Sequence, residues 1–165
     1  MTFSTATTLR LCGAALGIAL ASVPLAAQPA PVPAQILTAK KVFISNAGID
    51  GPSGVTFKME GAGDVNAPYN RFYAAMKSWG RFEIVGAPSD AELVLEVRFT
   101  SQLSGEGLAS QLELTILDAR THFILWTLAE PVGLAARKAN WEKNFDQGMA
   151  SLVDAVKSLA GGVGR

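Results

Sequence analysis

The feature that most constrains this fold is a regular alternation of apolar and polar side chains between residues 91 and 128. In Ala91–Thr100 every second position is apolar, and Gln111–Leu117 repeats the alternation. His122–Leu128 places apolar side chains on both sides. Successive side chains of a strand point to opposite faces, so these segments predict β-strands. The connections Ser104–Gly107 and Asp118–Thr121 are short turns, which indicates a three-strand antiparallel meander.

Two amphipathic helices flank this meander in the sequence. The first begins at Pro68 and ends at Gly80, with large side chains at helical spacing, namely Tyr69, Phe72, Tyr73, Met76 and Trp79. The second begins after a possible cap at Asn140 and ends at Gly161 and Gly162; its apolar positions are Trp141, Phe145, Met149, Leu152, Val156 and Leu159. A helix with such a stripe must bury it, and a sheet is the available surface.

Two further strands are predicted, at Lys40–Ser45 and Arg81–Val85. The sequence therefore predicts an α+β fold, a two-layer sandwich. It contains a mostly antiparallel sheet of four or five strands with both helices packed on one face. No internal repeat or second domain is evident.

The first 27 residues have the layout of a secretory signal peptide. Arg10 precedes an apolar run, and Pro24–Ala27 supplies the small-residue exit, so we expect cleavage between Ala27 and Gln28. A retained anchor is the alternative, although Leu11–Ala27 is shorter than the roughly 20 residues that span a bilayer. Lipid attachment at Cys12 is not expected, because this cysteine stands at the start of the apolar run, whereas the lipid-bearing cysteine of a bacterial lipoprotein follows such a run. These features predict a periplasmic or secreted bacterial protein.

The rest of the chain divides into three predicted parts. Prolines at alternate positions from Pro29 to Pro33 disfavour helix and sheet, so residues 28–39 are interpreted as a Pro-rich tether. Residues 40–161 form the single domain, and residues 162–165 form a short tail. After cleavage no membrane-spanning segment is expected to remain.

Composition excludes several classes of function. The chain has 14 Lys and Arg against 14 Asp and Glu, a formal net charge of zero. Nucleic-acid binding and electrostatic binding to anionic membranes both need a basic surface, and neither is expected. The single cysteine lies in the signal segment and there is one histidine. We therefore expect no disulfide, metal site or cofactor.

The sequence also lacks a recognisable catalytic constellation. His122 is the only histidine, with Asp118 four residues before it and serines at positions 101, 104 and 110. No Gly-x-Ser-x-Gly elbow surrounds any serine. A small hydrolase that uses His122 as its base is the third hypothesis, and the protein is expected not to be an enzyme.

The long segment between residues 46 and 67 is the candidate partner-binding loop, because long loops in compact domains are often functional. Its candidate residues are Asn46, Gly48, Asp50, Gly54, Phe57, Gly61 and Asp64. The leading hypothesis is a binding or assembly module that presents this loop or a strand edge to an unknown envelope protein. The alternative is a carrier of a small apolar ligand between helices and sheet, suggested by Tyr69, Phe72, Tyr73, Trp79 and Trp141.

Three stretches together resemble a group of known proteins. The first is Ser89–Val97, a strand motif that contains Glu92. The second is Leu117–Thr121, which contains the pattern Asp-x-x-Thr, and the third is Ile124–Thr127, which contains Leu-Trp. With the closing helix they resemble small exported bacterial envelope proteins of uncharacterised families, in which a Gly commonly stands at the position of His122. The resemblance implies an envelope α+β domain and supplies no catalytic residues.

Overall fold

The computed structural model of this chain describes residues 30–51, 64–104, 107–133 and 137–161. The chain separates into two compact units, Met1–Ala30 and Pro31–Arg165. The predicted signal peptide, its cleavage site at Ala27 and Gln28, and the tail lie outside the described residues. The elements of the second unit are α1 (Ala34–Thr38), β1 (Lys41–Asp50), α2 (Ala67–Trp79), β2 (Glu83–Ile84), a 3-10 turn (Pro88–Asp90), β3 (Leu93–Ser104), β4 (Gly107–Asp118), β5 (Ile124–Val132) and α3 (Lys138–Gly161).

The five strands form one mixed sheet in the order β2-β1-β3-β4-β5. The predicted antiparallel meander is confirmed as β3, β4 and β5. The prediction of a mostly antiparallel sheet is wrong, because β1 runs parallel to both β2 and β3. The reason is the position of α2 in the chain. A helical crossover returns the chain to the end of the sheet where β1 began, so the next strands run in the same direction.

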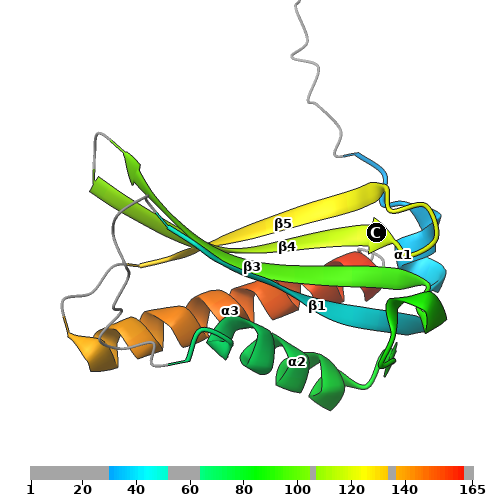
Figure 1. Ribbon diagram of the computed structural model, residues 1–165, viewed down its shortest axis with the longest axis horizontal. Helices are drawn as coiled ribbons and strands as arrows, with labels where there is room; N and C mark the ends of the chain where they lie inside the picture. Colours follow the sequence, from blue (N-terminus) through cyan, green and yellow to red (C-terminus); the bar gives the residue numbers. More distant parts are fainter. Residues whose placement is uncertain (1–29, 52–63, 105–106, 134–136, 162–165) are drawn as a thin grey trace, which may run out of the picture. The chain divides into compact units, whose positions relative to one another are not determined.

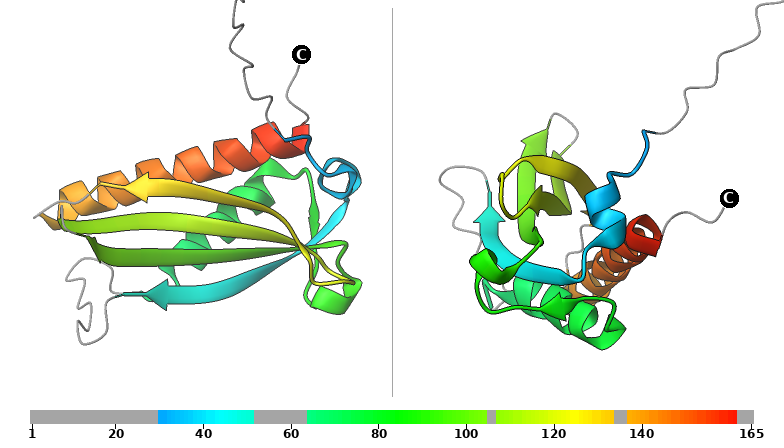
Figure 2. Two further views of the ribbon diagram at one scale, coloured as in Figure 1. Left: turned by 90° about the horizontal axis from the view of Figure 1, so that it is seen from above. Right: turned by 90° about the vertical axis from the view of Figure 1, so that its right-hand side faces the viewer.

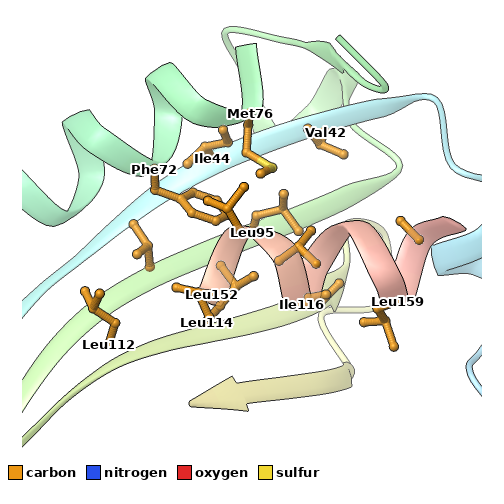
Figure 3. Close-up of a cluster of buried hydrophobic side chains, with 14 of the residues drawn as sticks. Val42, Ile44, Phe72, Met76, Leu95, Leu112, Leu114, Ile116, Leu152 and Leu159 are labelled. Carbon is orange, nitrogen blue, oxygen red and sulfur yellow. The ribbon is translucent and has the colours of Figure 1, made fainter. Parts of the chain in front are cut away.

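Helices α2 and α3 pack on the same face of the sheet, as predicted (Figures 1 and 2). Phe72 and Met76 of α2 and Leu152 of α3 are buried in one apolar cluster with the inward side chains of the sheet. Figure 3 shows this cluster, with Leu95 of β3 and Leu114 of β4 facing the two helices. Alternate positions of the strands therefore line the core, and the positions between them lie on the helix-free face.

A third helix lies in the segment that was predicted to be tether. Helix α1 spans Ala34–Thr38, and Ile36 and Ala39 are 2% and 4% exposed within the main core. The proline spacing disfavours regular structure only up to Pro33. Burial of Ile36 in the core outweighs the low intrinsic stability of so short a helix. The core of the domain thus includes residues before position 40.

Strand β1 is longer than the sequence predicted. It continues through Asn46 to Asp50, five residues that were assigned to the long loop. The pairing with β3 shifts register between Asn46 and Gly48, and Gly48 has a φ of 86°. A β-bulge at this point absorbs the Asn-Ala-Gly sequence that otherwise indicates a turn. Pairing with the long strand β3 therefore extends β1 beyond its apolar segment.

Candidate binding surface

The two ends of the sheet carry different chemistry. We call the end with the β4–β5 turn (Asp118–Phe123) and the start of β1 the hairpin end. We call the end where β1 finishes at Asp50 and β3 finishes at Ser104 the loop end. No helix in the described part of the chain is long and apolar enough to cross a membrane. Within the same residues no three His, Cys, Asp or Glu side chains are grouped to hold a metal ion.

The helix-free face changes from apolar to polar along the strands. Near the hairpin end an apolar row crosses four strands in register: Phe43 pairs with Val94, Val94 with Leu117, and Leu117 with Ile124. Val94 is only 7% exposed, whereas Ile124 at the end of the row is 64% exposed. The next row is Ser45, Glu96, Thr115 and Thr127. Val94 near the middle of the row is therefore buried, whereas Ile124 at the β5 end of the row is exposed to solvent.

A polar cluster occupies the loop end of the same face. Arg98 Nη1 lies 3.2 Å from Asp50 Oδ2, and Thr100 donates a hydrogen bond of 3.4 Å to Glu113 Oε1. The amide of Gln111 also donates to Glu113. A shallow depression at this cluster is lined by Asp50, Arg98, Thr100 and Glu113 together with Gln102 and Leu103. The cluster offers both charge signs and hydrogen-bonding groups on the surface of the sheet.

The candidate loop residues fall into three groups. Asp50 belongs to the polar cluster just described. Asn46 donates through Nδ2 to Asn66 Oδ1 at 2.8 Å, and its Oδ1 accepts the Gly48 N–H at 3.0 Å. Asp64 accepts from the Asn66 N–H at 2.8 Å and the Asn70 amide at 3.0 Å, which fixes the start of α2. Gly54, Phe57 and Gly61 lie outside the described residues.

The edge of β1 that faces away from β3 has only a short partner. On this side the N–H of Val85 donates to the carbonyl of Val42. On the opposite side, which faces β3, the N–H of Glu92 donates to the carbonyl of Lys41. Because successive residues of a strand point their backbone groups to opposite sides, the N–H and C=O of Ile44 and Asn46 face the same side as those of Val42. In the described residues β2 pairs only with Lys41 and Val42. The edge beyond Val42 therefore has no strand partner there.

The acidic residues of the motifs that suggested the envelope resemblance have structural roles. The carboxylate of Glu92 accepts hydrogen bonds from the backbone N–H groups of Lys40 and Lys41, which lower its pKa. Asp118 Oδ1 accepts from the N–H and hydroxyl of Thr121 and the N–H of Arg120. These bonds, those of Thr121 first, lower the pKa of Asp118. Both carboxylates fix the hairpin end of the sheet.

The residues considered for hydrolysis are far apart. His122 is exposed at the hairpin end and has a φ of 58°, the left-handed conformation that glycine adopts most easily. Ser101 and Ser110 are buried and hydrogen-bonded to each other at 2.7 Å. Ser110 and Asp118 are separated by about 26 Å along β4 at 3.3 Å per residue. His122 therefore cannot activate either of these serines directly.

The aromatic residues considered for a ligand carrier pack into the core. Phe72 is fully buried, and Tyr69, Tyr73, Trp79 and Trp141 pack against the main cluster. Trp141 has its ring centroid 5.1 Å from that of Phe145. This is the ordinary role of an aromatic stripe on a helix that covers a sheet.

No protein-family model and no curated protein matches the chain. Solved structures with a partial likeness include the C-terminal domain of LpoB from Salmonella enterica, which is 13% identical with a TM-score of 0.41 over 58% of this chain and 83% of that chain. The PelC dodecamer from Paraburkholderia phytofirmans is 13% identical with a TM-score of 0.44, covering 80% and 94%. Uncharacterized lipoprotein B from Nitrosomonas europaea is 15% identical with a TM-score of 0.35, covering 81% and 89%. Likenesses at this level establish neither a family nor a function for this chain.

Proposed function

We propose that this protein is an exported, non-enzymatic binding or assembly module of the bacterial cell envelope. Its partner is a protein that adds an extended segment to β1 at the loop end of the sheet. The observation that carries the proposal is the edge of β1 beyond Val42, where backbone groups of Ile44 and Asn46 face away from β3. An unpaired strand edge is a template for β-augmentation, in which main-chain hydrogen bonds supply affinity.

Specificity in such a complex comes from side chains beside the edge. Asp50, Arg98 and Glu113 lie on the adjacent helix-free face and can select a partner with complementary charges. The bulge at Asn46 and Gly48 shortens the regular part of the edge, which limits indiscriminate pairing.

Export is supported by the predicted signal peptide, and cleavage after Ala27 predicts a soluble periplasmic species that begins at Gln28. Intact mass and fractionation of the protein expressed from its full gene measure this directly.

The binding proposal is tested by two substitutions at one position. Asn46→Pro removes the N–H that faces the edge, whereas Asn46→Ala retains it; both lose the same side-chain hydrogen bonds. We expect the wild type and Asn46→Ala to capture the same envelope protein from a membrane and periplasm extract, and Asn46→Pro to lose this capture at least tenfold. Circular dichroism verifies that both variants fold.

Arg98→Gln tests the contribution of the polar cluster. Its ion pair with Asp50 is exposed and contributes only about 0.2–1 kcal/mol to stability, so the variant should fold normally. Capture should weaken severalfold, whereas Lys77→Gln, an exposed position on α2, should leave it unchanged. Equal capture by the folded Asn46→Pro variant and the wild type, or no specific capture by either, would overturn the proposal.

A further inference from the structure

The flank of α2 that faces away from α3 carries two tyrosines. Arg71 of α2 forms an ion pair with Asp146 of α3, and its guanidinium carbon lies 4.9 Å from the centroid of the Phe145 ring, so this side of α2 faces α3. Because each residue turns a helix by about 100°, Tyr69 and Tyr73 lie about 160° around α2 from Arg71. Both are half-buried, and their ring centroids are 5.9 Å apart. The two rings form one aromatic surface, which we call the tyrosine pair.

The tyrosine pair lies beneath the open edge of β1, on the helix side of the sheet. Helix α2 packs on β1 and β3, whereas α3 packs on β4 and β5. Only the short strand β2 lies outside β1 in the sheet order, so the flank of α2 that faces away from α3 points beyond β1. Figure 1 shows α2 running below β1. The start of α2 is fixed to this strand by the hydrogen bond of 2.8 Å from Asn46 Nδ2 to Asn66 Oδ1.

The tyrosine pair is level with the backbone groups that face outward from β1. Helix α2 runs opposite to β1, because Asn66 bonds Asn46 near the end of β1 and the segment after α2 pairs with the start of β1. Tyr69 and Tyr73 follow Asn66 by about 4.5 Å and about 10.5 Å along the helix axis. Ile44 precedes Asn46 by about 6.6 Å along the strand. The pair thus lies beside the stretch from Asn46 to Ile44, whose outward N–H and C=O groups have no strand partner among the described residues.

The open backbone groups and the tyrosine pair together define what binds at this edge. Unpaired main-chain donors and acceptors along a strand bind an extended backbone, and alternate side chains of that backbone point to the helix side. Alternate residues of a strand are about 6.6 Å apart. Residues four apart on a helix are separated by about 6 Å along its axis. Two alternate side chains of an added strand therefore match the spacing of the two rings.

We infer that the segment added to β1 carries large apolar side chains at two alternate positions, i and i+2, which pack on Tyr69 and Tyr73. The inference rests on the proposed addition of an extended segment to β1, and it names the kind of segment. The side chain at position i+1 points to the helix-free face, where Arg98 and Asp50 favour a polar or charged group. The rings are already held against the core, so they lose little conformational freedom when they are covered.

The test uses random nine-residue peptides displayed on bacteriophage and selected on the protein in the form that a bacterial host exports. We expect the enriched peptides to carry large apolar side chains at positions i and i+2. The best binder is synthesised with a fluorophore, and fluorescence anisotropy measures its Kd. Replacing its two apolar residues with serine should raise Kd at least tenfold, and replacing the residue between them should raise it less. This comparison changes only the peptide, so it does not depend on the folding of a protein variant.

Substitutions in the protein identify the surface that the peptide contacts. Tyr69→Ser and Tyr73→Ser should each weaken peptide binding at least fivefold, whereas Tyr69→Phe and Tyr73→Phe should retain it, because the ring supplies the contact. Trp126→Ser is the matched control and should bind equally. Trp126 is also half-buried against the core, but it lies on β5 at the opposite edge of the sheet. Circular dichroism verifies that each variant folds.

The Asn46→Pro variant distinguishes failure of this inference from failure of the proposed function. Peptides that lose binding to Asn46→Pro but bind the folded tyrosine-to-serine variants equally would overturn the inference and leave strand addition standing. Peptides that lose binding to the serine variants but bind folded Asn46→Pro equally would overturn both. A selection that enriches no peptide, or only peptides without the i and i+2 pattern, would also overturn the inference, while capture from the envelope extract tests strand addition by itself.

Discussion

At the scale of single residues, the hairpin end depends on the hydrogen bonds that two carboxylates accept, those of Glu92 and Asp118. Glu92 connects the starts of β1 and β3, because its side chain accepts the N–H groups of Lys40 and Lys41 and its backbone N–H donates to Lys41. Asp118 organises the turn before β5. A carboxylate that accepts several N–H bonds is stabilised in its charged form, which explains why both pKa values are lowered.

The lowered pKa values of Glu92 and Asp118 predict how the stability of the folded protein changes with pH. A lowered folded-state pKa contributes stability that is complete above the ordinary values of 4.5 for Glu92 and 3.8 for Asp118, and that is lost as the pH falls through the lower folded values. We expect Glu92→Gln to melt below the wild type at pH 7 and to approach it below pH 4. Thermal unfolding between pH 3 and 7 measures this, with Glu83→Gln on β2 as the control. A difference in Tm that stays constant over this range would contradict the account.

At the scale of elements, α3 approaches β5 closely at one glycine. A Cβ atom at Gly148 would lie 3.1 Å from Val132 Cγ2 and 3.3 Å from the backbone oxygen of Pro131. The same glycine is buried in the middle of α3, where glycine is normally unfavourable by about 1 kcal/mol relative to alanine. Close packing of helix on strand is therefore the physical reason for a glycine at this position.

Gly148→Leu should consequently destabilise the protein although leucine favours helix. Overpacking against Val132 and the Pro131 backbone should lower the free energy of unfolding by about 1–3 kcal/mol. Ala150→Leu, at an exposed position of the same helix, should change it by less than about 0.5 kcal/mol. Urea unfolding of the two variants compares these values, and equal effects would show that α3 does not pack on β5 at Gly148.

At the scale of the whole molecule, the folded domain includes α1. Ile36 and Ala39 belong to the same core as the buried side chains of α2, α3 and the sheet. Arg81 Nη2 also donates a hydrogen bond of 2.9 Å to the carbonyl of Leu37, which ties α1 to the segment before β2. The start of the domain is thus set by tertiary contacts rather than by the composition of the proline-containing segment.

Substitutions at two neighbouring positions of α1 test this boundary. Ile36→Ala should lower the free energy of unfolding by about 2–4 kcal/mol, because it removes a buried side chain and leaves a cavity. Leu37→Ala should cost less than about 1 kcal/mol, because Leu37 is 36% exposed. Thermal or urea unfolding distinguishes the two. Similar small losses for both would show that α1 is not part of the cooperative core.

The candidate surface was only partly predictable from the sequence. The glycines and polar residues after Ser45 predict a turn and a long loop, whereas β1 continues through a bulge to Asp50. The Arg98–Asp50 pair and the apolar row from Phe43 to Ile124 join residues from different strands. Such groupings depend on strand order and register, which local patterns do not specify.

The sequence by itself determined the meander, the two long helices and the face of each that is buried, because period-two and helical spacing are local consequences of backbone geometry. It also determined the tight turn at Asp118–Thr121. Only the tertiary structure decided that β1 lies parallel between β2 and β3, that Ile36 joins the core, and that Phe123 is exposed beside the entry of the chain. These features arise from contacts between segments distant in sequence, whose free energies outweigh local propensity.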